Sequence, residues 1–256
     1  TTCVIDLADP QAITTAVDGL LAQHGAIDIL VNNAGVVSTQ PASDVSLTDW
    51  NTTLAINLTA PMVLTQRVLP AMGAKGWGRI VNVSSISGVR AGTGRLAYGS
   101  SKAALIAMTG QFAIEFAERG ITVNAIAPGF VDTPMIRTLH GSSKQSTYLN
   151  VCPMHRFCSP EEVSAAVVFF TSESASFITG QTLVVDGGKI SALGHASELL
   201  PTLPADIEIT HYQDALITPG FIDTHIHLPQ TGMVGAYGEQ LLDWLNTYTF
   251  PCESQF

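Results

Sequence analysis

The amino-acid sequence predicts an α/β protein built on a doubly wound parallel sheet. Short apolar runs alternate along the chain with longer segments that begin with helix-start signals. The runs carry few polar residues, which is typical of strands that a parallel sheet buries on both faces. Polar residues follow several of the runs, at the strand ends where α/β sheets place their chemistry.

The first three elements follow from local signals. A helix is expected from Pro10 to Gly25, because an aspartate N-cap precedes the proline, which fits the first helical position. An apolar strand is expected over residues 27–33. The next helix opens on Ser46 with a pattern that resembles a capping box, and it is expected to run toward Met72.

The alternation continues in the second part of the chain. A strand is expected over residues 79–83, followed by a loop over 87–97 and a helix that carries Tyr98 and ends near Gly120. The remaining predicted elements are a strand at 121–126, a helix that starts at Ser159 with a serine cap, a proline and a glutamate, and a final strand at 181–185.

Tyr98 and Lys102 are the chemically most informative pair. At positions i and i+4 they project from one face of a helix, one turn apart. A free phenol has a pKa of about 10, and a nearby ammonium group favours the phenolate and lowers that value. Ser85 follows the strand at 79–83, so its hydroxyl is expected at the end of that strand. These groups can polarise a carbonyl oxygen and deliver a proton to it.

The order of further motifs resembles the short-chain dehydrogenase/reductase family over about residues 1–188. The matching stretches are Asn32-Asn33-Ala34-Gly35, Asn57 in its Ile-Asn-Leu context, Ser85 with Tyr98-x-x-x-Lys102, Pro128-Gly129 to Thr133, and Val185-Asp186-Gly187-Gly188. The resemblance implies a Rossmann-like sheet, NAD or NADP as cofactor, and a small carbonyl or alcohol as substrate. It also implies a homo-oligomer, a tetramer whose subunits pair through the helix that bears Tyr98 and the helix before it.

The resemblance implies a role for each matching residue. Asn57, Ser85, Tyr98 and Lys102 would be catalytic, with Tyr98 as acid/base, Ser85 on the carbonyl oxygen and Asn57 on a water that relays protons from Lys102. The cofactor would be held by Tyr98, Lys102, Asp6, Leu7, Asn32, Ala34, Gly35, Pro128, Gly129 and Thr133. Three alternatives stay open: Asn32 as a brace of the sheet, Asn57 as the cause of a helix kink, and Asp6 as a turn residue.

The composition of the chain disfavours some classes of binding partner. The chain of 256 residues has a formal net charge of −10, which disfavours nucleic acids and anionic membrane surfaces as partners. The mean hydropathy is +0.29, yet no apolar run is long enough to span a bilayer. No C-x-x-C pair occurs among the four cysteines, which we interpret as reduced thiols of a cytoplasmic protein that fill space in the fold; they are Cys3, Cys152, Cys158 and Cys252.

The first residues resemble the family's third strand, over residues 3–6. The two preceding strands and the TGxxxGxG turn that would hold the cofactor pyrophosphate are therefore expected to be absent, and strand edges to be exposed. The residue that selects NAD or NADP would be lost with them.

The last part of the chain has a different character. Residues 216–230 resemble the start of the metal barrel of the amidohydrolase superfamily, and the sequence to residue 253 is similar to guanine deaminase. His225 and His227 alternate along a strand and can face one zinc ion, and Gln230 would contact the purine. The resemblance divides the chain into a reductase domain at 1–188 and a deaminase-like piece at 189–256, which would hold the small β domain and the start of a β/α barrel.

Three functions are therefore considered. The first is an NAD(P)-dependent oxidoreductase, similar to 3-oxoacyl-carrier-protein reductases or to sugar and polyol dehydrogenases. The second is a zinc-dependent guanine deaminase of which only the N-terminal piece is present. The third is an inactive composite of the two. A substrate lid is expected over residues 136–156.

Overall fold

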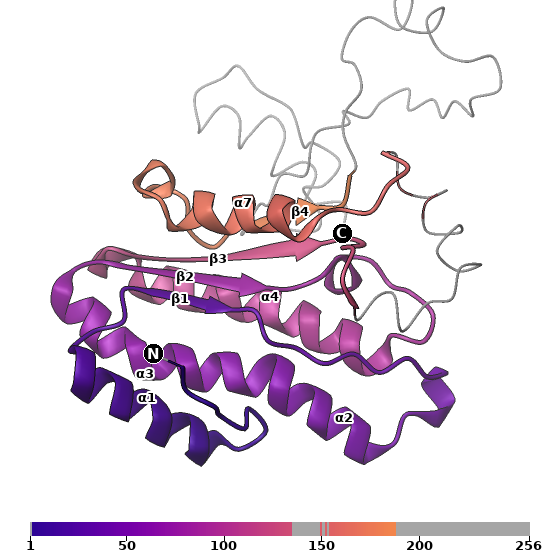
Figure 1. Cartoon of the computed structure of the whole chain (residues 1–256), viewed down its shortest axis with the longest axis horizontal. Helices are drawn as coiled ribbons and strands as arrows, with labels where there is room; N and C mark the ends of the chain where they lie inside the picture. The colour runs from indigo at the N-terminus through magenta and orange to yellow at the C-terminus, as the bar shows by residue number, and fades with distance from the viewer. Residues whose placement is uncertain (1, 135–148, 150–151, 153, 188–256) are drawn as a thin grey trace, which may run out of the picture. The chain divides into compact units, whose positions relative to one another are not determined.

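A computed structural model of the chain describes residues 2–134, 149, 152 and 154–187. The chain divides into two compact units, Thr1–Ser191 and Ala192–Phe256, and all described residues belong to the first. In that unit four parallel strands form one sheet in the order β1-β2-β3-β4 (Figure 1). They are β1 (Ile29–Asn32), β2 (Gly78–Val83), β3 (Ile121–Pro128) and β4 (Thr182–Val185).

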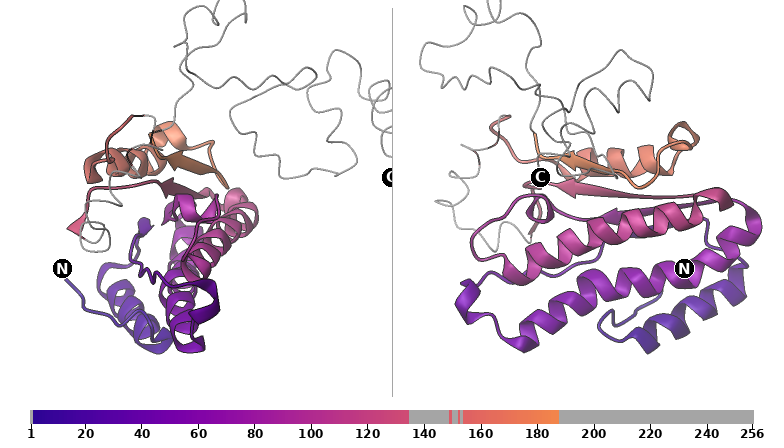
Figure 2. Two further views of the ribbon diagram at one scale, coloured as in Figure 1. Left: turned by 90° about the vertical axis from the view of Figure 1, so that its right-hand side faces the viewer. Right: turned by 180° about the vertical axis from the view of Figure 1, so that it is seen from behind.

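Helices cover both faces of the sheet, which confirms the doubly wound architecture (Figure 2). The helices are α1 (Pro10–His24), α2 (Leu47–Leu54), α3 (Ala60–Lys75), α4 (Leu96–Phe116) and α7 (Pro160–Thr171). One apolar core joins α1, α3 and α4 to β2 and β3, with fully buried Ile13, Met72 and Val123 among its members. The other joins α7 to the opposite face through Phe170, Val81 and Ile126.

The predicted helix starts are confirmed. The Asp9 side chain accepts hydrogen bonds from the amides of Gln11 and Ala12, at 2.8 and 3.2 Å, before α1. Before α7, Ser159 and Glu162 form a complete capping box. These caps satisfy amide groups that have no partner within the helix, so each helix begins where its cap lies.

One long helix was expected from Ser46 toward Met72, and the backbone is helical over this range, with a π-helical turn inside it. The π-helical turn Ala55–Thr59 separates α2 from α3 and contains the fully buried Asn57. Single π-helical turns within α-helices are frequent at functional sites. The long helix expected from Ser46 is therefore present, and only its hydrogen-bond pattern changes, at the position of a predicted catalytic residue.

The expected strand at residues 3–6 does not form. Residues 2–6 have no regular secondary structure, and Val4 is 96% exposed. A strand needs a neighbour that pairs with its backbone, and none of the described strands pairs with this segment. Within the described sheet β1 is an edge strand, with Ile29 and Val31 45% and 39% exposed. The exposed strand edge that the sequence predicted is thus present at β1.

None of the helices in the described residues is long and apolar enough to cross a membrane.

Candidate active site

Ser85 lies directly after β2, at the carboxyl edge of the sheet. It is 8% exposed, and its hydroxyl oxygen accepts a hydrogen bond of 3.1 Å from the amide of Ser87. That bond caps the short 3-10 turn Ile86–Gly88, which turns the chain back toward α4. The serine is thus held by its own turn, at the strand end where the sequence placed it.

Tyr98 and Lys102 lie one turn apart on α4, as their spacing predicts. The ammonium nitrogen of Lys102 is 5.9 Å from the centroid of the Tyr98 ring. Lys102 is 3% exposed and donates a hydrogen bond of 2.8 Å to the carbonyl oxygen of Val83, the last residue of β2. Burial lowers the pKa of Lys102 to about 8, because an ammonium group loses hydration inside the protein.

The turn that bears Ser85 packs directly on the backbone of α4. The buried Ser84 hydroxyl donates to the carbonyl oxygen of Lys102 at 2.8 Å. A Cβ added at Gly88 would lie 2.7 Å from the carbonyl carbon of Lys102, so only a glycine fits at this contact. The position of Ser85 relative to Tyr98 and Lys102 therefore depends on the close approach between this turn and the helix.

Asn57 connects the loop after β1 to the same helix. Its side-chain oxygen accepts from the amide of Val36 at 2.8 Å, and its side-chain nitrogen donates to the carbonyl of Val36 at 2.9 Å. The same nitrogen donates to the hydroxyl of Ser101 at 3.1 Å, and Ser101 donates to the carbonyl of Tyr98 at 2.7 Å. Asn57 thus bonds to backbone, as one interpretation of the sequence held, but to that of Val36, outside its own helix.

The loop after β1 approaches the buried lysine closely. A Cβ added at Gly35 would lie 3.3 Å from both the Lys102 nitrogen and the Asn57 side-chain oxygen. Ala34, beside it, is exposed. A lysine ammonium has three protons to donate, and Val83 is its one hydrogen-bond acceptor among the described residues. The polar groups around Gly35 therefore suit a ligand that presents hydroxyl groups, as the ribose of a dinucleotide does.

Asn32 lies in a buried polar network beneath this loop. Its side-chain nitrogen donates to the side-chain oxygens of Asn82 at 2.8 Å and Thr65 at 3.4 Å, and Asn82 donates to Thr109 at 2.9 Å. These bonds join β1, β2, α3 and α4, so the geometry supports the interpretation of Asn32 as a brace of the sheet. The side-chain oxygen of Asn32 is buried and has no hydrogen-bond partner in the described part of the chain.

Pro128 ends β3, and Gly129 follows it at the same edge of the sheet. The amide of Gly129 donates to the carbonyl of Val185 at 2.9 Å, and a Cβ there would lie 2.9 Å from the Cα of Asp186. The turn is therefore pressed against the end of β4. Thr133 lies further along the same segment and is partly exposed.

Asp6 and Leu7 precede α1 rather than lie at the end of a strand. Asp6 is exposed, and its carboxylate accepts from the amide of Ala8 at 2.9 Å, which stabilises a turn over Leu7 and Ala8. The geometry supports the interpretation of Asp6 as a turn residue.

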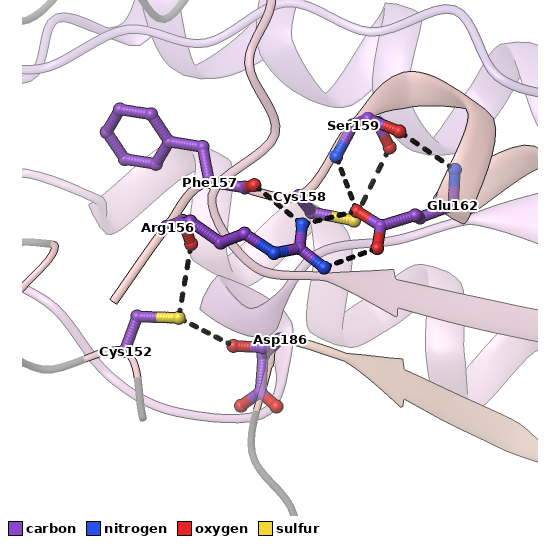
Figure 3. Close-up of polar contacts among 7 residues, drawn as sticks. All are labelled: Cys152, Arg156, Phe157, Cys158, Ser159, Glu162 and Asp186. Carbon is purple, nitrogen blue, oxygen red and sulfur yellow. Dashed lines mark hydrogen bonds and ion pairs between the residues drawn. The ribbon is translucent and has the colours of Figure 1, made fainter. Parts of the chain in front are cut away.

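Cys152 and Cys158 contact backbone, whereas Cys3 is exposed. Cys152 is buried, and its single S–H can donate to the carbonyl of Arg156 or to that of Asp186, whose oxygens lie 3.4 and 3.6 Å from the sulfur (Figure 3). Burial raises the pKa of the Cys158 thiol, whose hydrogen donates to the Ser159 carbonyl. Both thiols fit the expected space-filling role. The exposed Cys3 does not, and Cys252 lies outside the described residues.

Some predicted site residues cannot be placed. His225, His227 and Gln230 lie outside the described residues, as does most of the expected lid over 136–156. Within the part of the chain that is described, no three His, Cys, Asp or Glu side chains are grouped so that they could hold a metal ion.

Sequence reasoning did not name Ser84, Gly88 or Ser101. Each acts through a contact between segments far apart in sequence; Ser101 also stands next to Lys102 in the sequence. The position of Ser101 directly beside Lys102 is the signal in the sequence that could have indicated it. The structure adds that this serine is fully buried and hydrogen-bonded.

The buried lysine predicts a pH dependence of stability. The pKa of Lys102 is about 8 in the fold against 10.5 in an unfolded chain, so between these values the unfolded state binds more protons. Stability contributed by Lys102 should therefore rise from pH 8 to pH 10.5, by about 3 kcal/mol at 1.36 kcal/mol per pKa unit. Denaturant unfolding would give the free energy of unfolding of the wild type and of Lys102→Met at each pH in this range. The value for the wild type should rise relative to that of the variant as the pH increases. If the two free energies of unfolding differ by the same amount at every pH, the pKa of Lys102 is not lowered by burial.

Two separate parts of the chain match known protein families. Residues 1–189 match the family model described as enoyl-(acyl carrier protein) reductase, and residues 216–256 match that of the amidohydrolase family. Both resemblances noted in the sequence are thereby confirmed at the level of the family.

Curated relatives and solved structures match the first part. The chain is 42% identical over 184 residues to the 3-oxoacyl-[acyl-carrier-protein] reductase of Aquifex aeolicus, covering 72% of this chain and 74% of that one. It is 38% identical to nodulation protein G of Azospirillum brasilense, with the same shares. A gluconate 5-dehydrogenase of Burkholderia cenocepacia, solved with NADP and tartrate, has a TM-score of 0.70 and 32% identity, over 74% of this chain and 75% of that one.

Proposed function

The chain belongs to the short-chain dehydrogenase/reductase family, and from that premise we propose that it interconverts a carbonyl and an alcohol by hydride transfer, with Tyr98 as acid/base. The observation that carries the proposal is the buried Lys102 one turn from Tyr98, at the strand end that bears Ser85. Family members of this kind act on small molecules, which is the class of partner proposed here.

Tyr98 would give its phenol proton to the carbonyl oxygen in reduction and take it back in oxidation. A bound nicotinamide would supply or accept the hydride at the carbon. Lys102 would stabilise the phenolate, because its ammonium group lies on the same helix face and carries positive charge below a pKa of about 8. Ser85 would donate a hydrogen bond to the oxygen as negative charge develops there.

Asn57 would keep the loop after β1 and the catalytic helix at a fixed distance. Its bonds to Val36 and Ser101 span that gap, and Ser101 in turn holds the carbonyl of Tyr98. We also propose that Asn57 holds the water through which Lys102 exchanges protons with solvent.

The nicotinamide ribose would be held by Tyr98 and Lys102, and the cofactor would pass along Asn32, Ala34 and Gly35. The geometry around Gly35 supports this path. The remaining proposed contacts are the turn at Pro128 and Gly129, Thr133, and Asp6 with Leu7 at the adenine end.

The choice between NAD and NADP and the substrate are tested together. The full chain would be assayed with NADPH and with NADH against a 3-oxoacyl thioester and against 5-ketogluconate, since relatives include reductases of the first and dehydrogenases related to the second. We expect oxidation of one cofactor that depends on a carbonyl substrate. No substrate-dependent oxidation with either cofactor would favour the inactive composite instead.

We further propose that the enzyme forms a homo-oligomer, a tetramer. Leu96 and Ile114 on α4 are 43% and 78% exposed, and apolar residues at this exposure suit a helix that pairs with a second copy. Sedimentation of a monomer across micromolar concentrations would contradict this.

The amidohydrolase match supports the descent of residues 216–256 but names no activity for them. We propose that His225 and His227 are zinc ligands and Gln230 a purine contact only in a complete barrel, because a catalytic zinc takes at least three protein ligands. One tightly bound zinc per chain, with ammonia released from guanine, would make the deaminase the better proposal.

A further inference from the structure

A cleft of about 950 Å³ lies beside the first turns of α4. It is lined by residues 39–42, by the loop at 87–95 and by the start of α4. Ser87 and Gly88, which line it, follow Ser85 in the chain, and Gly99 and Ser100 follow Tyr98. The cleft has the size of a small-molecule site, and a substrate whose carbonyl lies at Ser85 and Tyr98 would extend into it.

The loop at 87–95 forms one wall of this cleft and is held near both of its ends. At its start the amides of Val89 and Arg90 donate to the carbonyl of Ile86, at 3.0 and 2.8 Å. Near its end Gly94 has a φ of +68°, and a Cβ there would lie 3.3 Å from the methyl carbon of Thr39 on the opposite wall. The width of the cleft therefore depends on where this loop lies.

Arg90 ties the loop to a distant part of the sheet. Its guanidinium group forms an ion pair with the carboxylate of Asp186, the residue that follows β4. β3 lies between β2 and β4 in the sheet, so the ion pair joins segments that follow two non-adjacent strands. The Arg90 side chain is 67% exposed and lines the cleft, whereas that of Asp186 is 19% exposed.

Asp186 is a firm anchor because its backbone is packed from two sides. A Cβ added at Gly129 would lie 2.9 Å from the Cα of Asp186, so the ends of β3 and β4 are in close contact. On another side the sulfur of Cys152 lies 3.6 Å from the Asp186 carbonyl oxygen (Figure 3). Cys152 belongs to the segment at 136–156 that the sequence predicts as a substrate lid. The ion pair thus connects one wall of the cleft to the place where that segment meets the sheet.

We infer that Arg90 and Asp186 are positioning residues, whose ion pair holds the wall of the cleft where it favours binding of the carbonyl substrate. Neither residue takes part in proton or hydride transfer. The inference rests on the proposed function, because it assigns the cleft to the substrate whose carbonyl Tyr98 serves. A direct contact between Arg90 and the substrate would have the opposite consequence, since Asp186 would then compete with the substrate for the guanidinium group.

Asp186→Asn separates these two roles, because it keeps the size of the side chain and removes its charge. Asp186→Asn and Arg90→Gln should each raise KM for the carbonyl substrate by about two- to fivefold, the effect of one partly exposed ion pair. They should leave kcat within about twofold, and Arg90→Lys should recover part of the affinity. The double variant should have the KM of either single variant, because both changes remove the same interaction.

Arg67→Gln is the control, because it removes a partly exposed ion pair with Asp18 that joins α3 to α1 away from the cleft. It should leave KM unchanged. A KM that falls in Asp186→Asn would show that Arg90 binds the substrate directly, and it would overturn the inference. Additive effects of the two single changes in the double variant would overturn it as well.

Hydrogen–deuterium exchange of the full chain without cofactor or substrate tests the position of the loop independently of turnover. In Asp186→Asn and in Arg90→Gln, peptides that cover residues 86–95 should exchange about two- to fivefold faster than in the wild type, whereas those of α3 should not change. Equal exchange in wild type and variants would overturn the inference. Faster exchange of this loop in the variants, in a wild type that reduces no carbonyl substrate, would count against the proposed function and not against the hold of the ion pair on the loop.

Discussion

Tyr98→Phe should lower kcat by about a hundredfold to ten-thousandfold, the usual contribution of a positioned acid/base group. The substitution removes one hydroxyl and keeps the ring, so the contacts of that ring with Lys102 and Arg95 remain possible. Affinity for the cofactor should therefore change little, because no charged group is lost. Steady-state kinetics and a fluorescence titration of the cofactor would measure the two quantities separately.

Turnover that survives in Tyr98→Phe would remove Tyr98 from the mechanism. Loss of both turnover and cofactor binding would instead show that the hydroxyl is needed for the cofactor site. A pH profile adds a third readout, since a variant without the phenol should also lose the pH dependence that an acid/base group confers.

Gly88→Ala should lower kcat by about a hundredfold through a displacement rather than a lost functional group. An added Cβ would lie 2.7 to 2.9 Å from backbone atoms of Lys102 and Ala103, and backbone cannot move aside as a flexible side chain can. The turn at Ile86–Gly88 must then move away from α4, and Ser85 moves with it. A misplacement of about 1 Å at a reacting group can cost about a hundredfold in rate.

Gly110→Ala is the control, because Gly110 lies in α4, the helix that the turn of Gly88 contacts, and the added carbon would have nothing within 4 Å. It should leave kcat unchanged and raise the stability by about 0.5–1 kcal/mol, the usual gain from replacing a helical glycine by alanine. Gly88→Ala with normal kcat would mean that the turn does not position Ser85. Thermal unfolding of both variants would separate this effect from a general loss of structure.

The elements that local signals determine were predicted well. β2 and β3 could be predicted from their apolar runs, and the start of α7 from its capping residues, without knowledge of the rest of the fold. The catalytic pair on α4 follows from helical spacing alone. The prediction of a strand at residues 3–6 was wrong because a strand depends on a neighbouring strand that pairs with it. The residues of the segment itself do not determine whether that neighbour is present.

The missed features depend on contacts between distant segments. The π-helical turn forms where Asn57 bonds to Val36 and Ser101, 21 and 44 residues away in sequence. The pocket lined by residues 39–42, 87–96 and the start of α4 combines segments far apart in sequence, which the sequence of either segment does not reveal. Residue patterns therefore indicated the chemistry, whereas the structure was needed for the groups that hold it in place.

Transfer of a deuteride would test the proposed function most directly. The full chain would be incubated with the carbonyl substrate that the assays select and with NADPH or NADH deuterated at the nicotinamide C4. The mass of the alcohol product would be measured by mass spectrometry. Hydride transfer to the carbonyl carbon predicts one deuterium at the new carbinol carbon of the product. Tyr98→Phe should form little of this labelled alcohol. An alcohol that forms without deuterium from either face of the cofactor would contradict hydride transfer, and with it the assignment of Ser85, Tyr98 and Lys102.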